Sequence, residues 1–392
     1  MTPIQPAARR YDLDWLRIIA FGLLVFYHVG MFYVPWDWHV KSVHAGSGAE
    51  PLMRLSSPWR LSLLFFISGV AFAYLYDKAG SAWRFASERA WRLFPVIVFG
   101  MLVVVMPQTY FQLREMGEIE PGILAFWPRY IFGWEIAGIE VPTWNHLWYV
   151  AYLFVYALIL APAMGLLNAF GRGPGTLLGR LWETRLGPVA LIVLPFVPMM
   201  AYRIFLVPHF EIKQNLTDDW ANHAICFTYL IYGVFAARSV RFWTVVDRAL
   251  PLALAATLVL AAVLTPVWIF WDALLDRPLE LWAARTGRVL YAWTMILTLL
   301  GLARRYLSGD GPVRRYLTEA IFPVYILHQT ITVSAGYALT RLGFGVWQEF
   351  VLLTAITVAG AFAGFEIARR IPVLRQLMGL KSKPKGARLS PA

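Results

Sequence analysis

The sequence of 392 residues has a single cysteine, Cys226, and few charged residues, which make up only 15% of the chain. One cysteine excludes an intramolecular disulfide and a cysteine-rich metal site. The chain also lacks the HxxxH and HExxH histidine pairs that hold metal ions on helices, so we expect no metal. No internal repeat is visible, which weakens an interpretation as a transporter built from inverted halves.

Hydrophobic residues are abundant instead. They make up 59% of the chain, occur in runs of about twenty, and give a mean hydropathy of +0.57. This pattern predicts an all-α, polytopic membrane protein with about ten transmembrane helices. We expect residues 1–368 to form the membrane-embedded domain and residues 369–392 a basic cytoplasmic tail, partly disordered over its last dozen residues. The expected spans are 16–34, 57–77, 92–111, 144–167, 188–207, 220–237, 249–271, 286–303, 320–340 and 346–368.

The basic residues indicate the orientation. Placing both termini in the cytoplasm assigns most of the 35 Lys and Arg residues to the inner side, as the positive-inside rule requires. The pI of about 9.8 therefore reflects topology at the lipid bilayer, and we expect no nucleic-acid partner. The first span follows Arg9 and Arg10 as a signal peptide would, but it contains Arg17 and lacks a cleavage pattern, so we expect a retained helix.

Two ionisable residues interrupt this first apolar run. Arg17 and His28 are eleven residues apart, which is about three helical turns, so they lie on nearly one face and about 16 Å apart. Ionisable groups within a membrane span are costly in lipid and usually mark a functional site. A neutral His28 imidazole could act as a general base toward a hydroxyl. The alternative is that Arg17 snorkels to the headgroups and His28 is a packing residue.

Further arginines point to an anionic ligand. Arg89 and Arg92 lie in SERAWRLFP, where the third span begins, and guanidinium groups suit phosphate. The start of a helix adds unpaired N–H groups and a favourable dipole. With Arg17, these residues could bind an anionic ligand such as a phosphate group. The alternative is that two arginines before a span are only topology signals.

Polar residues also occur inside other spans. Ser68 in LLFFISGV could be a nucleophile or, more simply, a small residue that lets helices approach closely. His146 and His328 could each orient an acceptor sugar or bond a neighbouring helix. None of the seven histidines falls in an expected cytoplasmic loop, which suggests polar chemistry facing the outer half. The long outer segment 112–143 should contain a re-entrant or surface-lying helix.

Together these motifs carry a family resemblance. The segment DWLRIIAFGLLVFYH, with Asp14, Arg17 and His28, resembles the signature of the acyltransferase 3 family of bacterial integral-membrane acyltransferases. The Arg89 and Arg92 pair and the motifs FFISG, HLWYV and YILHQ are similar to further motifs of that family and occur in its order. The resemblance implies a ten-helix enzyme of the bacterial inner membrane, without a permanently bound cofactor. It would move an acyl group from cytoplasmic acyl-CoA to a sugar hydroxyl at the periplasmic face.

The resemblance also implies roles for residues. His28 would be catalytic, and the arginines would contact the acyl-CoA donor. Asp14, Ser68, His146, Trp148 and His328 are possible acceptor-binding or supporting residues. The family's acidic group near the catalytic histidine has no clear counterpart, and Asp218 and Asp219 are the candidates for it.

Other segments resemble a branch of the family that acts on glucans. They are WDWHVKS, WRLSLLFFISG and RRIPVLRQLMGLK. This resemblance implies transfer of a succinyl or acetyl group to a periplasmic glucan or surface polysaccharide, and Arg60 is a candidate partner for a succinyl carboxylate. Two other classes stay open. A transporter or flippase for a glycan or lipid-linked sugar would use the buried Arg and His as substrate or proton sites, and a non-catalytic membrane subunit would not need them on one face.

Overall fold

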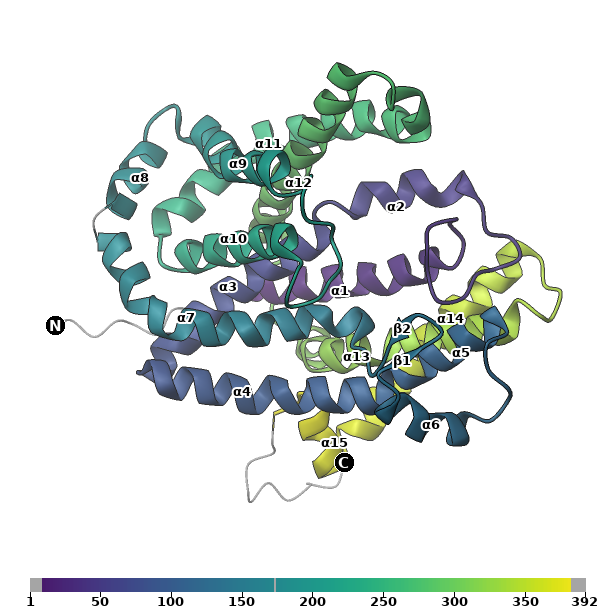
Figure 1. The fold of residues 1–392 in the computed structure, drawn as a ribbon. Helices are drawn as coiled ribbons and strands as arrows, with labels where there is room; N and C mark the ends of the chain where they lie inside the picture. Colours follow the sequence, from purple (N-terminus) through teal and green to yellow (C-terminus); the bar gives the residue numbers. More distant parts are fainter. Residues whose placement is uncertain (1–8, 173, 382–392) are drawn as a thin grey trace. The chain divides into compact units, whose positions relative to one another are not determined.

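The computed structural model describes residues 9–172 and 174–381, and these form helices apart from one short hairpin (Figure 1). The predicted all-α class is therefore confirmed. The first half of the chain contains α1 Tyr11–Met31, η1 Ser47–Ala49, α2 Glu50–Ser56, α3 Arg60–Ala79, α4 Ala82–Phe99, the π-helical segment η2 Gly100–Val104, α5 Met106–Met116, α6 Ile123–Phe132, β1 Glu135–Ile136, β2 Ile139–Glu140, η3 Asn145–Leu147, α7 Trp148–Arg172 and α8 Pro174–Glu183. The second half contains α9 Gly187–Phe205, α10 Trp220–Ala237, α11 Val240–Ile269, η4 Trp271–Leu274, α12 Pro278–Tyr306, α13 Pro312–Leu339, α14 Val346–Ala368 and α15 Pro372–Leu377.

Eight helical stretches in the described part are long and apolar enough to cross a membrane, so this is a multi-pass membrane protein. They cover α1, α3, α4 with α5, α7, α9, α11, α12 and α14. The expected spans 220–237 and 320–340 are also helical, as α10 and α13, but are not among the eight. Polar residues explain this, since α10 contains Asn222 and His223 and α13 contains His328 and Gln329. The count of ten and the cytoplasmic placement of both termini stay predictions.

The chain divides into two compact units, which we describe separately. Unit 1 comprises Met1–Ala20, Gly48–Ala86 and Tyr156–Thr318, and unit 2 comprises Phe21–Ser47, Ser87–Val155 and Glu319–Ala392. Helices α1, α4, α7 and α13 contribute residues to both units.

Close approach of α3 and α10 organises unit 1. A Cβ atom on Gly69 would lie 1.9 Å from the Leu230 carbonyl oxygen, and one on Gly233 would lie 1.9 Å from the Phe66 carbonyl oxygen. Only glycine permits this contact between backbones, which is typical of helices that pack through small residues in membranes. Ser68 lies buried beside Gly69, so the FFISG segment packs helices together in unit 1.

A side chain of α12 replaces a hydrogen bond that a proline removes from α9. Pro195 has no N–H, so the Leu191 carbonyl one turn earlier loses its helical partner. The Trp293 indole N–H donates to that oxygen at 3.0 Å. Helix α9 therefore continues through Pro195, as membrane helices do when a neighbour satisfies the released carbonyl.

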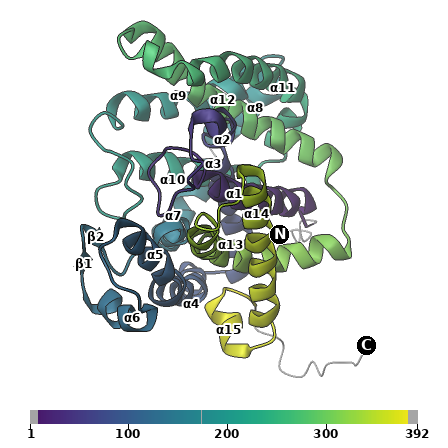
Figure 2. The ribbon, with the colours of Figure 1, turned by 90° about the vertical axis from the view of Figure 1, so that its right-hand side faces the viewer.

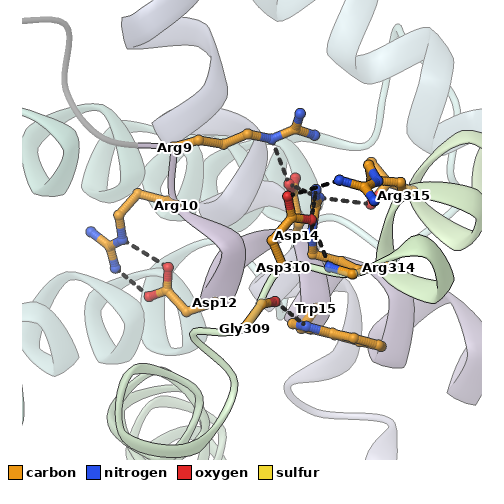
Figure 3. A network of polar contacts seen from close by, with 11 residues as sticks. Arg9, Arg10, Asp12, Asp14, Trp15, Gly309, Asp310, Arg314 and Arg315 are labelled. Atoms are coloured by element: carbon orange, nitrogen blue, oxygen red, sulfur yellow. Dashed lines mark hydrogen bonds and ion pairs between the residues drawn. The ribbon is translucent and has the colours of Figure 1, made fainter.

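An ion network joins the first turns of α1 and α13 (Figure 3). Arg314 is 1% exposed and contacts the carboxylates of Asp14 and Asp310, each at 2.7 Å. The Trp15 indole donates to the Gly309 carbonyl at 3.2 Å. A buried guanidinium needs such paired carboxylates because desolvation of an unpaired charge is expensive. Asp14 is therefore engaged in holding these two helix starts together.

The π-helical segment η2 connects three elements of unit 2. A π turn displaces the usual helical hydrogen bonds and releases carbonyl groups. Its carbonyls accept from the Tyr130 hydroxyl at 2.9 Å, the Trp127 indole at 2.8 Å and the Thr330 hydroxyl at 2.5 Å. Tyr130 and Trp127 belong to α6, the helix predicted within segment 112–143, and Thr330 belongs to α13. The segment thus fixes α6 and α13 against the end of α4.

The beginning of the predicted tail is folded against unit 2. Helix α15 follows α14 directly and lies beside its end (Figure 2). Arg375 donates to the carbonyls of Arg369 and Lys381, at 2.8 and 2.6 Å, and pairs with Glu319 at 3.3 Å. Residues 382–392, for which disorder was predicted, lie outside the described residues, and the domain boundary at 368 stays a prediction.

Candidate active site

Three histidines from separate elements of unit 2 meet in its interior. His28 of α1 stacks on His328 of α13 with ring centroids 4.9 Å apart. His146 of η3 lies edge-on to both rings, 5.2 Å from His328 and 6.4 Å from His28. His328 and His146 are buried, while His28 is partly exposed. The structure therefore brings together all three histidines that were selected from the sequence.

Hydrogen bonds assign the protons on the His28 and His328 rings. The Nδ1 atom of His328 lies 2.6 Å from the Tyr325 carbonyl, which can only accept, so this nitrogen carries the proton. In the neutral ring Nε2 is then the acceptor, and it lies 2.7 Å from Nδ1 of His28. His28 must donate from Nδ1. Its Nε2 is consequently the basic nitrogen, suited to accept a proton.

Tyr325 places this arrangement. Its carbonyl orients His328 one turn later on α13, and its ring packs at 4.9 Å from the Phe21 ring of α1. Its hydroxyl donates to the His146 carbonyl at 2.5 Å. One side chain on α13 thus touches the elements that carry the other two histidines, which explains why the three rings share one location.

His146 has its own fixed tautomer. Its Nε2 donates to the Ile326 carbonyl at 3.0 Å, and its Nδ1 accepts from the Gln108 amide at 3.4 Å. Trp148, on the next turn, is buried and packs edge-to-face on Tyr152 at 5.0 Å. Among the residues that the structure describes, no group of three His, Cys, Asp or Glu side chains is arranged to hold a metal ion. His146 thus lies within the histidine cluster in a fixed orientation, whereas the contact shown for Trp148 is with Tyr152 on its own helix.

A network of neutral amides extends from His146. The Gln108 carbonyl oxygen accepts from Gln329 at 3.0 Å, and the Gln329 amide also lies 3.1 Å from Nε2 of His39. His39 donates from Nδ1 to Gln112 at 2.6 Å. Gln108 and Gln329 are almost fully buried. This network was missed in the sequence, although a Gln directly after His328 and a Gln in the apolar run VVVMPQTY were signals for it.

The loop after α1 holds His39 in this network. The Lys41 ammonium donates to the carbonyls of Met31, the last residue of α1, and of Val34 in the loop that follows, at 2.8 Å each. The neighbouring Ser42 hydroxyl donates to the buried carboxylate of Glu349 at the start of α14. Burial lowers the pKa of His39 more than its hydrogen bond to Gln112 raises it, and burial lowers the pKa of Lys41 to about 8. His39 is therefore a neutral imidazole in a fixed position.

The predicted donor arginines lie on two helices. Arg17 belongs to unit 1 and is half-buried, and within residues 9–172 and 174–381 it makes no hydrogen bond or ion pair. Arg89 and Arg92 belong to unit 2, one turn apart on α4, where each charge acts on the other. Arg92 donates to the Gly379 carbonyl at 3.3 Å. No carboxylate within the described residues forms an ion pair with Arg89, so the pair is suited to an anion.

The carboxylates expected near His28 have other partners. Asp218 pairs with Lys213 at 3.1 Å, and Asp219 accepts from Asn222 at 2.8 Å, all within unit 1. In unit 2 the ring partner of His28 is an imidazole rather than a carboxylate. The expected role of Asp218 or Asp219 beside His28 stays a prediction. A backbone carbonyl behind a second histidine takes the orienting role.

Comparison with known proteins defines the class. A family model described as an acyltransferase domain, that of the acyltransferase 3 family, matches residues 10–366. The chain belongs to this family, and it is a membrane acyltransferase that transfers groups other than amino-acyl groups.

The similar curated proteins share a more specific name than the family. Glucans biosynthesis protein C from Salmonella paratyphi A (strain ATCC 9150 / SARB42) is 24% identical over 404 aligned residues, covering 97% of both chains. The same protein from Salmonella enteritidis PT4 (strain P125109) is 23% identical with the same coverage. No solved structure matches the chain. The resemblance read from the motifs is thus confirmed at the level of the family.

Proposed function

We propose that this protein transfers an acyl group, succinyl or otherwise acetyl, from cytoplasmic acyl-CoA to a hydroxyl of a periplasmic glucan or surface polysaccharide. The observation that carries the proposal is the hydrogen-bonded chain from the Tyr325 carbonyl through His328 to His28. It leaves the basic Nε2 of His28 in a partly exposed ring. A histidine in a fixed neutral tautomer is the group that hydroxyl acylation requires.

The reaction follows from this geometry. Nε2 of His28 takes the proton of the acceptor hydroxyl while the hydroxyl oxygen attacks the thioester carbonyl. The positive charge that develops on His28 is stabilised through Nδ1–H, which donates to His328. When the carbon–sulfur bond breaks, the leaving CoA thiolate takes the proton from His28. The imidazole returns to its starting tautomer without net change.

The arginines would bind the donor. Acyl-CoA carries phosphates at one end and the thioester at the other, so it needs cations at a distance from the base. Arg17 and His28 lie on one helix about 16 Å apart, and Arg89 with Arg92 adds two adjacent guanidinium groups. Each can form paired hydrogen bonds to phosphate oxygens. Acyl-CoA is a co-substrate in this scheme.

The amide network would support the acceptor side of the site. Gln108 and Gln329 are buried and bond to one another and to His39, so they would hold the partly exposed His39 ring, a neutral group of a kind that suits sugar hydroxyls. The glucan comes from the name of the similar Salmonella proteins, whose whole length the chain covers closely. A periplasmic acceptor and a cytoplasmic donor place the protein in the bacterial inner membrane.

Purified protein in detergent tests the function when it is given succinyl-CoA or acetyl-CoA with a glucan oligosaccharide. We expect the product mass to increase by one acyl group with one donor, and we expect His28→Ala to abolish the transfer. The control is His44→Ala, which removes a histidine whose ring bonds the Phe344 carbonyl, outside the cluster. Wild-type protein that acylates no glycan with either donor, or full activity in His28→Ala, would refute the proposal.

A further inference from the structure

Unit 1 contains a cluster of three arginines that the proposed reaction does not use. Arg203 lies in the last turn of α9, and Arg285 and Arg288 lie in the first half of α12. These two helices pack together, as the bond between Trp293 and the Leu191 carbonyl shows. Arg285 and Arg288 are close enough for their charges to act on Arg203. Three like charges gathered in this way favour a bound anion.

The chain itself supplies little countercharge here. Within residues 9–172 and 174–381, neither Arg203 nor Arg285 forms a hydrogen bond or an ion pair. The Nε atom of Arg285 is buried and makes no hydrogen bond, which is costly for a guanidinium N–H. Some other arginines of unit 1 have carboxylate partners, for example Arg238 with Asp77 and Arg304 with Asp247. An external anion would supply the countercharge that Arg203 and Arg285 do not receive from the described residues.

Topology signals do not explain the cluster. In the predicted orientation the end of α9 and the start of α12 face outward, where the positive-inside rule predicts few arginines. An arginine that runs against this rule carries a cost in membrane insertion. Three arginines at this end of the two helices are therefore not explained as topology signals.

The surroundings indicate a lipid. Only 17% of the apolar window of α9 is buried, so most of this helix faces outward from the described protein. Next to Arg203, Ile204 is 43% exposed and Phe205 is 69% exposed. Trp282, one turn before Arg285, is 39% exposed. Cations beside exposed apolar and aromatic side chains match a phosphate headgroup with its acyl chains.

We propose that Arg203, Arg285 and Arg288 form a binding site for the phosphate of a phospholipid headgroup on unit 1. Guanidinium groups bind a phosphodiester through charge-assisted, paired hydrogen bonds, while the acyl chains lie along the exposed face of α9. The site does not involve the histidines of unit 2, so it stands or falls independently of the acyl transfer.

Native mass spectrometry of the delipidated full chain in maltoside detergent tests the site with three probes. They are phosphatidylglycerol, diacylglycerol with the same acyl chains, and inorganic phosphate. We expect phosphatidylglycerol to bind, diacylglycerol to bind at least about tenfold more weakly, and Arg203→Gln with Arg285→Gln to weaken phosphatidylglycerol by a similar factor. The matched control is Arg180→Gln with Arg185→Gln, which removes the same charge from two exposed arginines of unit 1 and should leave binding unchanged.

The outcomes separate the alternatives. Equal binding of diacylglycerol and phosphatidylglycerol would overturn a phosphate site. Unchanged phosphatidylglycerol binding in Arg203→Gln with Arg285→Gln would overturn the assignment to these arginines. Displacement of the lipid by inorganic phosphate at equal concentration would assign the cluster to a soluble phosphate and overturn the lipid. A variant that elutes as a folded particle and loses only phosphatidylglycerol would support the proposal.

Discussion

The two units bury polar groups in different ways. In unit 1 the buried polar side chains include Arg314, held by two carboxylates, and backbones touch at Gly69 and Gly233. In unit 2 the buried histidines and glutamines form a neutral network of imidazoles and amides that contains His328 and Gln108, while the buried carboxylate of Glu349 is bonded separately by Ser42. Ion pairs and glycine contacts hold helices in place, whereas neutral imidazoles can exchange protons. We therefore expect close packing to matter most in unit 1 and the proposed chemistry to lie in unit 2.

This difference has a physical cause. A charged pair buried in unit 1 is stable only while both partners remain, because each compensates the desolvation of the other. A proton moved within such a pair would leave an uncompensated charge. In unit 2 each neutral ring both donates and accepts, so His28 can gain a proton and share the charge with His328. A site for proton transfer is therefore better built from the second kind of network.

The largest effect that tests the difference between the two units is the loss of stability expected for Gly233→Ala in unit 1. Gly233→Ala places a methyl group 1.9 Å from the Phe66 carbonyl, so the helices must separate, at a cost of about 1–3 kcal/mol or more. Gly165→Ala on α7 has open space and should stabilise by about 0.5–1 kcal/mol, because alanine favours helix. Thermal unfolding in detergent measures both. A Gly233→Ala variant that unfolds at the same temperature as wild type, or at a higher one, would contradict the packing role of Gly233.

A unit 2 glycine completes this test. Gly364→Ala would meet only the terminal carbon of the Leu327 side chain, at 2.4 Å, and a side-chain end can rotate away. We expect a smaller loss of stability than for Gly233→Ala. A larger loss would mean that the two units do not differ in how closely their backbones pack.

The next effect concerns the donor. Arg89→Lys with Arg92→Lys keeps both charges but loses the planar fork, so the KM for acyl-CoA should rise about tenfold with little change in kcat. Arg84→Lys, on the same helix and exposed, is the matched control. Steady-state kinetics measures the effect. A KM equal to that of wild type would leave Arg89 and Arg92 as topology signals.

The smallest effect is a pH dependence of stability. Burial lowers the pKa of Lys41 from 10.5 to about 8, so between these values the unfolded chain binds the proton more strongly than the folded chain. Stability should therefore rise as the pH increases from about 8 toward 10.5, and level off below 8. The melting temperature of wild type minus that of Lys41→Met isolates this contribution. A difference that is constant or falls across this range would contradict it.

Sequence reasoning recovered the helices and part of the site. Hydropathy located the long helices, because a helix in lipid needs a continuous apolar run, which is visible in the order of the residues. It selected His28, His146 and His328 because ionisable groups stand out in such runs. It could not show that they meet, since the contacts of Tyr325 with Phe21 and His146 join residues far apart in the chain.

The contacts of other residues could not be predicted from the sequence. Gln108 and Gln329 stand in apolar runs, which indicates that each needs a hydrogen-bond partner, but the local sequence does not show that these partners are one another, His39 and His146. Asp14 was selected as part of the family signature, and only Arg314, 300 residues away, shows its structural role. Polar residues without charge and ion pairs of long range are thus the features that a sequence conceals.

The central claim is that His328 acts through His28, and a double-mutant cycle on the rate of acyl transfer tests it most directly. His28→Gln should lower the rate by about 10² to 10⁴. His328→Leu, which removes the acceptor of the Nδ1 proton, should lower it less, and His328→Gln should recover part of the loss because its amide oxygen can accept that proton. In the His28→Gln background we predict that His328→Leu causes no further loss, since the residue it positions is gone. Losses that multiply in the double variant, in protein that elutes like wild type, would contradict the account.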